Sequence, residues 1–457
     1  MRPIKKKYKY TKAEQEFNKV LKYQNNQLNS ILFDNKDETQ KLINDAEALL
    51  RKTDIKIPDH MAKMISKEKK VVSVKNWGSI LEKADTLYPH DVDLQELFSQ
   101  EELQKNELYI RKLNSEFNQI HKLDEFDITI AALAGIVSGI VDIVMVGIPQ
   151  KTSVGLKAAP LSNYVREYFE KAFPEEEMSK LANSKISKVP YDAQDNRNTA
   201  KYVEGLSAYY HRMLQLGHDP ILGFVFGVLD ILNGTMSTID KKGAFIIQNM
   251  PCYEERKEAT IFAALCKQIL HLQSDITTSM SLPVPLMSLF NFLQIGKIGE
   301  YEQTIAEIVQ GMYYEGYDFI HFCSMSIPVM ITEVIIRLGY ALKRIKEGHS
   351  IKESIPFSSN HQKHPKLGTM LFIGHSSATA INTGKLAFTE NPLAINYPQW
   401  IMFAKNSYLQ LKWVLKEKPE LRDRYVRDKI NDELLNAIEC ANTSFDEYFK
   451  DYIIVFE

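Results

Sequence analysis

Hydrophobic residues recur at three- and four-residue steps along much of the 457-residue chain, which is the spacing of an amphipathic helix. The first such run opens with a capping-box pattern, Thr11-x-x-Glu14, and a second begins near Asp37. A third runs from about Asp93 to His121, with charged residues between its hydrophobic positions. We therefore expect residues 1–125 to form a polar amphipathic helical arm.

Hydrophobic content then rises abruptly, because residues 128–148 are 21 positions dominated by Ile, Val, Ala and Gly, with Asp142 as the one charge. Such a segment is long enough to cross a bilayer, and it is equally typical of a helix buried on all sides in a soluble bundle. We expect an apolar helical core over residues 126–395 and C-terminal helices over 396–457 that pack on it. Further hydrophobic segments lie at 221–232, 282–295, 319–342, 367–388 and 395–411.

Strand signals are few. Val71–Val74 and Ile453–Phe456 have strand-like composition but are short, so they could pair only at a sheet edge. Polar residues and prolines predict loops at Pro174–Asn198, Asp240–Glu258 and Gly348–Lys366. The predicted fold class is all-α, a multi-helix bundle with buried glycine-faced apolar helices.

A nine-residue pattern occurs twice in the apolar core. GIVSGIVDI at residues 135–143 and GFVFGVLDI at residues 223–231 share two glycines four apart and an aspartate three residues after the second glycine. The recurrence predicts an internal repeat over residues 131–155 and 219–243.

The glycines predict close helix packing. Residues four apart share one face of a helix, so Gly135 with Gly139, and Gly223 with Gly227, would remove the side chains from that face. A second backbone could then approach each helix closely, and each apolar segment is expected to form a helix built for such a contact.

The aspartates of the two copies, Asp142 and Asp230, are expected to be buried near the same face. In one interpretation, each caps a neighbouring helix N-terminus or pairs with a buried Arg or Lys. In the other, the two carboxylates face one another, or a polar path, and bind a cation or line a pore.

Charge and cysteine content argue against several classes of protein, namely nucleic-acid-binding proteins, CxxC zinc proteins and disulfide-rich scaffolds. The chain has 56 Lys and Arg against 58 Asp and Glu, which argues against a nucleic-acid partner. Its four cysteines are widely spread, without the CxxC spacing of a zinc site or the density of a disulfide scaffold. The basic N-terminus lacks the apolar segment of a secretory signal, so we expect a cytoplasmic protein, with attachment to the inner face of a membrane as an option, rather than a secreted one.

Histidines and carboxylates after residue 210 are the candidate metal or ligand-binding residues. His271 and Asp275 are four residues apart and share a helical face, which suits a metal pair or an ordinary hydrogen bond. His375 lies among small and hydroxyl residues on a predicted helix, as in a polar network or a ligand pocket. The set is His211, His218, Asp219, His271, Asp275 and His375.

No nucleotide-binding loop or nucleophile motif occurs in the sequence, and no catalytic residue is assigned. We expect a non-enzymatic helical effector or accessory protein that self-associates or binds a protein partner, with engagement of a membrane as an option and without a cofactor. The alternative is a soluble helical metal-dependent hydrolase or ligand-binding bundle that uses the histidines after residue 210 with a divalent metal.

Overall fold

The chain folds into two compact units, which are Met1–Ile120 with Lys418–Glu457 (unit 1) and His121–Glu417 (unit 2). The structure is 68% helical with little strand, which confirms the predicted all-α multi-helix fold. The computed structural model describes residues 9–52, 70–153, 155–278, 280–298, 301–356, 358, 363–450 and 452–456.

Unit 1 combines both ends of the chain. Its first helix, α1, is continuous over 41 residues, where the sequence predicts two helices. The polar residues 34–40 interrupt the hydrophobic stripe, but they include no proline or glycine that would end a helix. The elements of unit 1 are α1 (Lys12–Lys52), β1 (Lys70–Val74), α2 (Trp77–Leu87), η1 (Leu94–Leu97), α3 (Gln100–His121), α15 (Lys418–Phe449) and β6 (Tyr452–Phe456).

The two short strands of unit 1 pair with each other. β1 and β6 form a parallel ladder in which Val71 lies opposite Ile453. Beside it, α3 packs along α15, where the rings of Phe117 and Tyr425 are 5.7 Å apart. Residues from 418 onward therefore belong to unit 1, whereas residues 396–417 belong to unit 2 with the apolar bundle.

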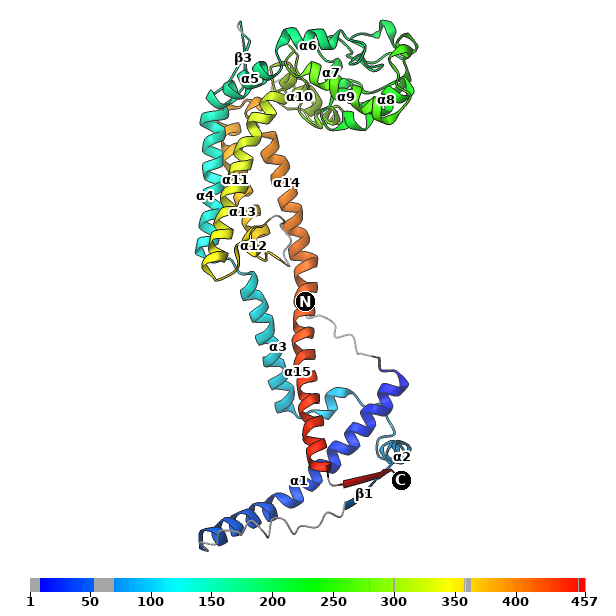
Figure 1. Cartoon of the computed structure of the whole chain (residues 1–457), viewed down its shortest axis with the longest axis vertical. Helices are drawn as coiled ribbons and strands as arrows, with labels where there is room; N and C mark the ends of the chain where they lie inside the picture. Colours follow the sequence, from blue (N-terminus) through cyan, green and yellow to red (C-terminus); the bar gives the residue numbers. More distant parts are fainter. Residues whose placement is uncertain are drawn as a thin grey trace. The chain divides into compact units, whose positions relative to one another are not determined.

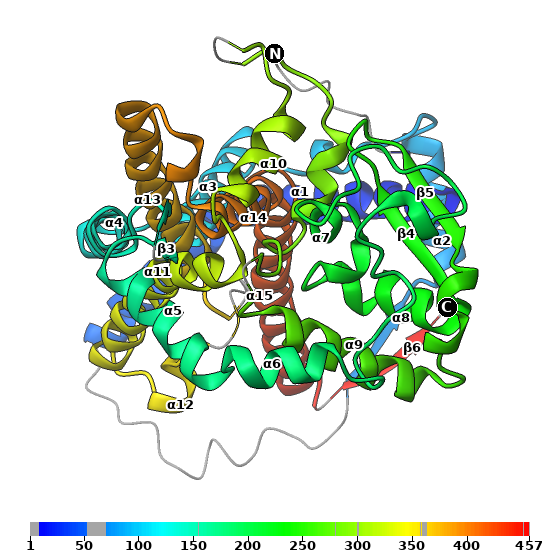
Figure 2. The same cartoon turned by 90° about the horizontal axis from the view of Figure 1, so that it is seen from above.

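Four helices of unit 2 form a bundle, and α4, α11 and α13 lie side by side in both views (Figures 1 and 2). α4 continues into one π-helical turn, η2 (Asp142–Val146), which ends where Gly147 takes a φ of 71°. α14 continues into a similar turn, η9 (Trp413–Glu417). The bundle helices are α4 (Glu125–Val141), α11 (Phe319–Lys346), α13 (Leu367–Thr389) and α14 (Tyr397–Lys412).

Residues 160–317 form what we call the globular part of unit 2. It is preceded by a small hairpin, β2 (Gln150–Thr152) with β3 (Gly155–Lys157). Two short helices, α12 (Ile351–Ser354) and η8 (Pro392–Ala394), lie in the connections of the bundle. The globular part contains α5 (Pro160–Ala172), α6 (Glu175–Ala182), η3 (Asn196–Asn198), α7 (His211–Leu214), η4 (Leu216–His218), η5 (Leu222–Phe224), α8 (Phe226–Asn233), β4 (Thr235–Ile239), β5 (Phe245–Asn249), η6 (Pro251–Arg256), α9 (Ile261–Asp275), η7 (Met287–Phe292) and α10 (Ile305–Tyr314).

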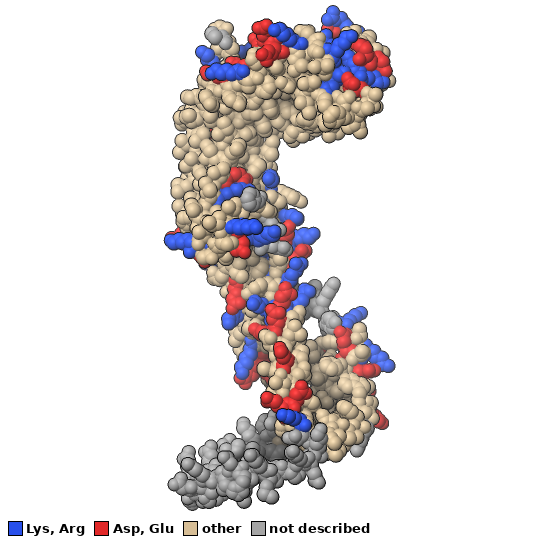
Figure 3. All heavy atoms as spheres, viewed as in Figure 1, with Lys and Arg blue, Asp and Glu red and all other residues tan. Residues whose placement is uncertain are grey.

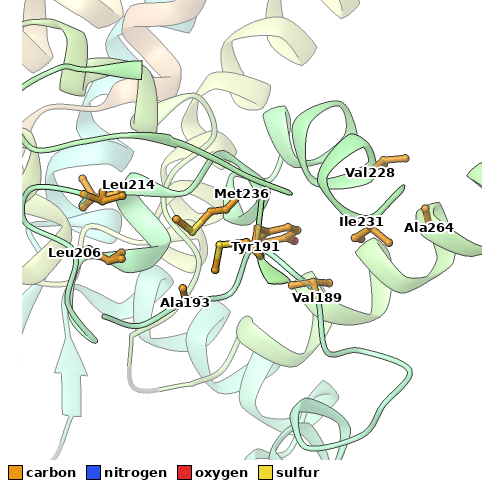
Figure 4. Packing of buried hydrophobic residues seen from close by; sticks show 11 residues of the cluster. Val189, Tyr191, Ala193, Leu206, Leu214, Val228, Ile231, Met236 and Ala264 are labelled. Carbon is orange, nitrogen blue, oxygen red and sulfur yellow. The ribbon is translucent and has the colours of Figure 1, made fainter. Parts of the chain in front are cut away.

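One apolar core of the globular part is centred on Tyr191, and a second contains Met287, Met312 and Tyr313. Tyr191 is completely buried in the first core among side chains from α7, α8, β4 and α9, including Ile231 and Met236 (Figure 4). The Tyr191 hydroxyl is hydrogen-bonded to the Gly217 carbonyl at 3.1 Å, so this large side chain brings no unsatisfied polar group into the core.

The predicted loops contain regular structure that the sequence signals missed. Asp240–Glu258 includes β5, which pairs antiparallel with β4, and Pro174–Asn198 includes α6. The turn between β4 and β5 needs Gly243 at a φ of 83°, so the glycine marks a two-strand hairpin rather than a long loop. The third predicted loop includes α12, and its residues 357 and 359–362 lie outside the described residues.

Candidate functional sites

The two copies of the glycine–aspartate pattern have different local structures. Gly135 and Gly139 lie within the single helix α4. Gly223 lies in the 3-10 turn η5, and Gly227 lies in α8 after a break at Val225. The expectation of one continuous helix through the second copy is therefore wrong.

The side chain of Asp219 stabilises the turn that precedes the second copy. Its Oδ1 accepts hydrogen bonds from the backbone N–H groups of Ile221 and Leu222, each at 2.9 Å. These bonds hold the chain in tight turns just before Gly223. Asp219 thus has a local capping role, and burial raises its pKa.

In the first copy, the glycines admit a neighbouring helix. A Cβ atom on Gly135 would lie 2.2 Å from the carbonyl oxygen of Gly374 in α13, and one on Gly139 would lie 2.7 Å from the Ile381 side chain. The backbones of α4 and α13 thus meet where the side chains are missing.

In the second copy, the glycines make room for a side chain. A Cβ atom on Gly223 would lie 2.6 Å from the Gln268 amide nitrogen, and one on Gly227 would lie 2.4 Å from its oxygen. The Gln268 amide nitrogen donates to the Gly217 carbonyl at 2.7 Å, and its oxygen accepts from the Tyr191 hydroxyl at 2.7 Å. The small face is therefore filled by one hydrogen-bonded glutamine.

Asp142 forms a buried ion pair inside the bundle. Its Oδ2 lies 3.0 Å from Lys385 Nζ on α13, and only 3% of the residue is exposed. Asn382 and Asn396 donate to its two oxygens at 3.0 and 2.7 Å. Lys385 also donates to the Gly147 carbonyl at 3.1 Å, so both charges are compensated by several bonds.

Asp230 is held by neutral donors. The Thr235 hydroxyl donates at 2.6 Å, and the Ser237 backbone and hydroxyl donate at 2.8 and 2.9 Å. Burial raises the pKa of this carboxyl group, and the three bonds lower it only in part. Asp142 and Asp230 share none of these partners, so the geometry is that of two separate structural carboxylates.

A cluster of histidines and aspartates lies in the globular part. It brings together His211, His218, His271 and Asp275, which the sequence singled out, and adds Asp192. His211 opens α7, His218 ends η4, and the other two helical residues lie in the last turns of α9. We call these five residues the histidine cluster.

The ligand atoms of the cluster are close together. Asp192 Oδ1 lies 3.6 Å from His211 Nε2 and 3.7 Å from His218 Nε2. Asp275 Oδ2 lies 3.1 Å from His218 Nδ1 and 3.7 Å from His271 Nε2. His218 is therefore common to two triads, in each of which the ligand atoms lie within 4.8 Å of one another.

Hydrogen bonds fix the orientation of two imidazole rings. His211 Nδ1 lies 2.9 Å from the Ala208 carbonyl oxygen and donates to it, so its Nε2 is left facing Asp192. His218 Nδ1 donates to Asp275, whose other oxygen accepts from Arg212 at 2.9 Å. His211 Nε2 thus faces Asp192 Oδ1, while His218 Nε2 lies 2.9 Å from Gln215 Oε1 and 3.7 Å from the same Asp192 oxygen.

Burial and charge set the protonation states around the cluster. Burial lowers the pKa of His211 to about 4 and lowers that of His271, so both rings are neutral at pH 7. Burial opposes ionisation of Asp275, but Arg212 and the neighbouring histidines outweigh it and hold its pKa below the usual range. The neutral His211, with its Nδ1 proton donated, presents an Nε2 lone pair to the Asp192 carboxylate.

Two atoms of the cluster are buried without a hydrogen-bond partner among the described residues, Asp192 Oδ1 and His271 Nε2. Unsatisfied buried polar atoms are rare in proteins because desolvation costs about 1–3 kcal/mol each. Their convergence at one place indicates room for an interaction that the protein atoms alone do not supply.

The sequence signals found most of the cluster, but not all of it. His375 lies elsewhere, in α13, where its Nε2 is 3.4 Å from Glu333 and its carbonyl accepts from Gln399. Asp192 was missed because it lies in a predicted loop and is brought to the histidines only by tertiary packing. Its neighbour Tyr191 is fully buried, but this burial is known only from the structure, so no local sequence signal marks Asp192.

The bundle also exposes two rows of aliphatic side chains. On α11, Met330, Val334, Leu338 and Leu342 follow one another at four-residue steps and are 51–65% exposed. Figure 3 shows the surface over α4 and α11 without charged atoms between the charged groups at the two ends of the bundle. The corresponding row on α4 and η2 contains Leu133, Ile136, Val137, Ile140, Ile143 and Val144, which are 40–59% exposed.

Comparison of the chain with protein-family models, with curated proteins and with solved structures found no match. Among the described residues, two helical segments, within Gln100–Val146 and Phe319–Lys346, are long and apolar enough to cross a membrane by length and composition.

Proposed function

We propose that this protein is a non-enzymatic, membrane-inserted helical protein, whose bundle lies in a lipid bilayer and holds the globular part outside it. The observation that carries the proposal is the pair of exposed aliphatic rows on α4 and α11. An exposed apolar surface of this extent is rare on a protein that is surrounded by water. In a bilayer, the same rows would face acyl chains at no cost.

The length of the apolar surface supports a bilayer as its surroundings. Residues 128–146 are 19 helical positions that extend for about 28 Å, close to the hydrocarbon thickness of about 30 Å. Asp142, the one charge among them, points inward to Lys385 and is not exposed to lipid. Ionisable residues within membrane bundles are expected to pair in this way.

Charged layers at both ends of the bundle also support the proposal. At one end, Asp127 pairs with Lys343 at 2.7 Å and with Lys366 at 3.3 Å. At the other end, Asp318, which caps α11, pairs with Arg166 at 2.8 Å. Charged groups at the two limits of an apolar span fit the interfaces of a bilayer.

The backbone contact between α4 and α13 fits the same interpretation. Helices in a bilayer gain little from hiding apolar side chains, so they associate through close packing of small residues. The approach of Gly135 to Gly374 supplies such packing. A bundle held in this way can keep its aliphatic residues on the outside.

The test is membrane fractionation of the full chain. Wild-type protein is expected to remain with membranes after high salt and alkaline carbonate, and to need detergent for extraction. Ile140→Lys places a charge in the middle of the α4 row, where the cost of insertion is about 2.5–3.5 kcal/mol. This variant is expected to shift from the membrane to the carbonate supernatant.

Leu108→Lys is the matched control, because Leu108 is an exposed leucine on helix α3 in unit 1 and is 58% exposed, against 53% for Ile140. It should fractionate like the wild type. The proposal fails if the wild type is soluble and monodisperse without detergent. It fails equally if the soluble wild type is an oligomer that Ile140→Lys converts to monomers, since the aliphatic rows would then be a self-association surface.

A further inference from the structure

We propose that the histidine cluster is a binding site for one divalent transition-metal ion, held by Asp192 Oδ1, His211 Nε2 and His218 Nε2. The site belongs to the globular part and does not depend on insertion of the bundle into a membrane. Imidazole and carboxylate together suit Zn²⁺ or a neighbouring ion such as Co²⁺, whereas Mg²⁺ and Ca²⁺ prefer oxygen ligands alone.

The spacing of the three ligand atoms fits a tetrahedral site. Metal–ligand bonds of about 2.1 Å at tetrahedral angles place neighbouring ligand atoms about 3.4 Å apart. The distances from Asp192 Oδ1 to His211 Nε2 and His218 Nε2 are 3.6 and 3.7 Å. These two distances are within a few tenths of an ångström of that value, and the ligand atoms of the triad all lie within 4.8 Å of one another.

The hydrogen-bond acceptors that hold the two histidine rings are of the kind found around bound metals. A ligating histidine usually donates its other N–H group to a carbonyl or carboxylate, which fixes the ring and makes the ligand nitrogen more basic. His211 does so to Ala208, and His218 does so to Asp275. Asp275 is a positioning residue in this arrangement, and Arg212 anchors it.

The unpartnered atoms point to the same conclusion. Asp192 Oδ1, a proposed ligand atom, is buried and lacks a donor, although a carboxylate oxygen normally accepts one or more hydrogen bonds. His271, which is 4% exposed, has an unpartnered Nε2, and its ring centroid lies 4.9 Å from that of His218. A cation beside His218 would satisfy the Asp192 carboxylate and leave His271 as a neighbour of the site.

Gln215 lies beside the proposed ion. Its Oε1 is 2.9 Å from His218 Nε2, and its amide nitrogen donates to the Ala193 carbonyl, so the oxygen is directed toward the site. In the absence of metal, this oxygen would accept a hydrogen bond from His218 Nε2–H. With metal bound, it is available as a further oxygen ligand.

The experiment is metal analysis of the full chain, purified in detergent without a histidine tag. We expect about one equivalent of transition metal per chain, and chelated protein is expected to regain it from added Zn²⁺ or Co²⁺. Co²⁺ should give the visible absorption bands of a tetrahedral nitrogen and oxygen site. His218→Ala removes the histidine that is common to both triads and is expected to abolish the bands.

Three further variants make the result interpretable. Asp275→Asn keeps all proposed ligands and should weaken metal affinity about 10- to 100-fold. Asp192→Asn removes the ligand charge at constant shape, so it tests the site even if His218→Ala fails to fold. His349→Ala removes an exposed histidine outside the cluster and should change nothing.

A wild type that takes up no Zn²⁺ or Co²⁺ would overturn the site. So would His218→Ala and Asp192→Asn proteins that bind Co²⁺ as tightly as the wild type. Because metal content is measured in detergent, it is independent of the fractionation result. Either proposal can fail without the other.

Discussion

The two copies of the GxxxG–aspartate pattern agree in sequence and differ in what meets them. At residues 135–143, the glycines admit the backbone of α13, and the aspartate forms an ion pair with Lys385. At residues 223–231, the glycines admit the amide of Gln268, and the aspartate is bound by hydroxyl and backbone donors. The pattern specifies a small face and a buried acid, while distant residues decide what fills the face.

The difference follows from the surroundings of each copy. The first lies in a bundle of long helices, where a backbone can run along the small face for several turns. The second lies at a tight turn in the globular part, where α8 has only 8 residues. A short helix next to a turn offers no length for helix-on-helix contact, so a side chain fills the gap instead.

The largest expected loss of stability follows from removing the cation that pairs with Asp142, a partner that Asp230 does not have among the described residues. Lys385→Met should destabilise the bundle by about 3–5 kcal/mol, because it leaves Asp142 buried without its cation. Lys405→Met on the exposed side of α14 is the matched control and should have little effect. Hydrogen exchange of α4 amides in detergent measures the change. An unchanged α4 in the Lys385 variant would mean that Asn382 and Asn396 alone satisfy the carboxylate.

A smaller difference in stability is expected between alanine variants of Gly135, which faces a backbone, and Gly227, which faces a side chain. Gly135→Ala should cost about 3 kcal/mol, because its Cβ would meet the Gly374 carbonyl and push two helices apart. Gly227→Ala should cost about 1–2 kcal/mol, because it displaces the Gln268 amide and its hydrogen bonds.

Gly384→Ala is the control for both glycine variants. This glycine is on α13 with nothing within 4 Å of the added Cβ, so alanine should stabilise the helix by up to about 1 kcal/mol. Denaturant unfolding followed by circular dichroism compares the three. Equal losses at 135 and 227 would show that both glycine faces are equally constrained.

Much of the helical fold could be predicted from the sequence, because helical periodicity is a local property. The predicted segments 319–342 and 367–388 match α11 and α13 closely. The capping box at Thr11 is present, where its backbone N–H donates to Glu14 at 2.7 Å. The pairing of β1 with β6 could not be predicted, since it joins residues more than 370 positions apart and depends on how α3 and α15 bring the chain ends together.

The candidate site was predictable only in part, for a related reason. His271 and Asp275 share a helix face at a four-residue step, so their proximity can be predicted from periodicity alone. Asp192 joins them through the burial of Tyr191, which no spacing rule predicts. Asp219 follows His218 in sequence but is not part of the histidine cluster. Its carboxylate instead accepts hydrogen bonds from the backbone N–H groups of Ile221 and Leu222.

The smallest expected difference is between two pH values, and it tests how Asp230 is held. Thr235→Val removes one of its donors and should cost about 1.5–2 kcal/mol near pH 7.5, where the bond is made to a carboxylate. Burial raises the folded-state pKa of Asp230, so the ionised group costs stability above that pKa, and the cost disappears as the pH falls toward the unfolded value. Losing a donor raises the folded pKa further. The penalty of the variant should therefore shrink to about 1 kcal/mol or less near pH 4.5.

Thr238→Val is the control for this pH dependence. Thr238 lies on the same strand, β4, and its hydroxyl donates to the neutral Ile246 carbonyl at 3.2 Å. Its loss should cost about 1 kcal/mol at either pH, because no titrating group is involved. Denaturant unfolding of both variants at the two pH values measures the difference. Parallel pH profiles for Thr235→Val and Thr238→Val would mean that Asp230 does not titrate in this range, and that the two aspartates of the pattern are equally well compensated.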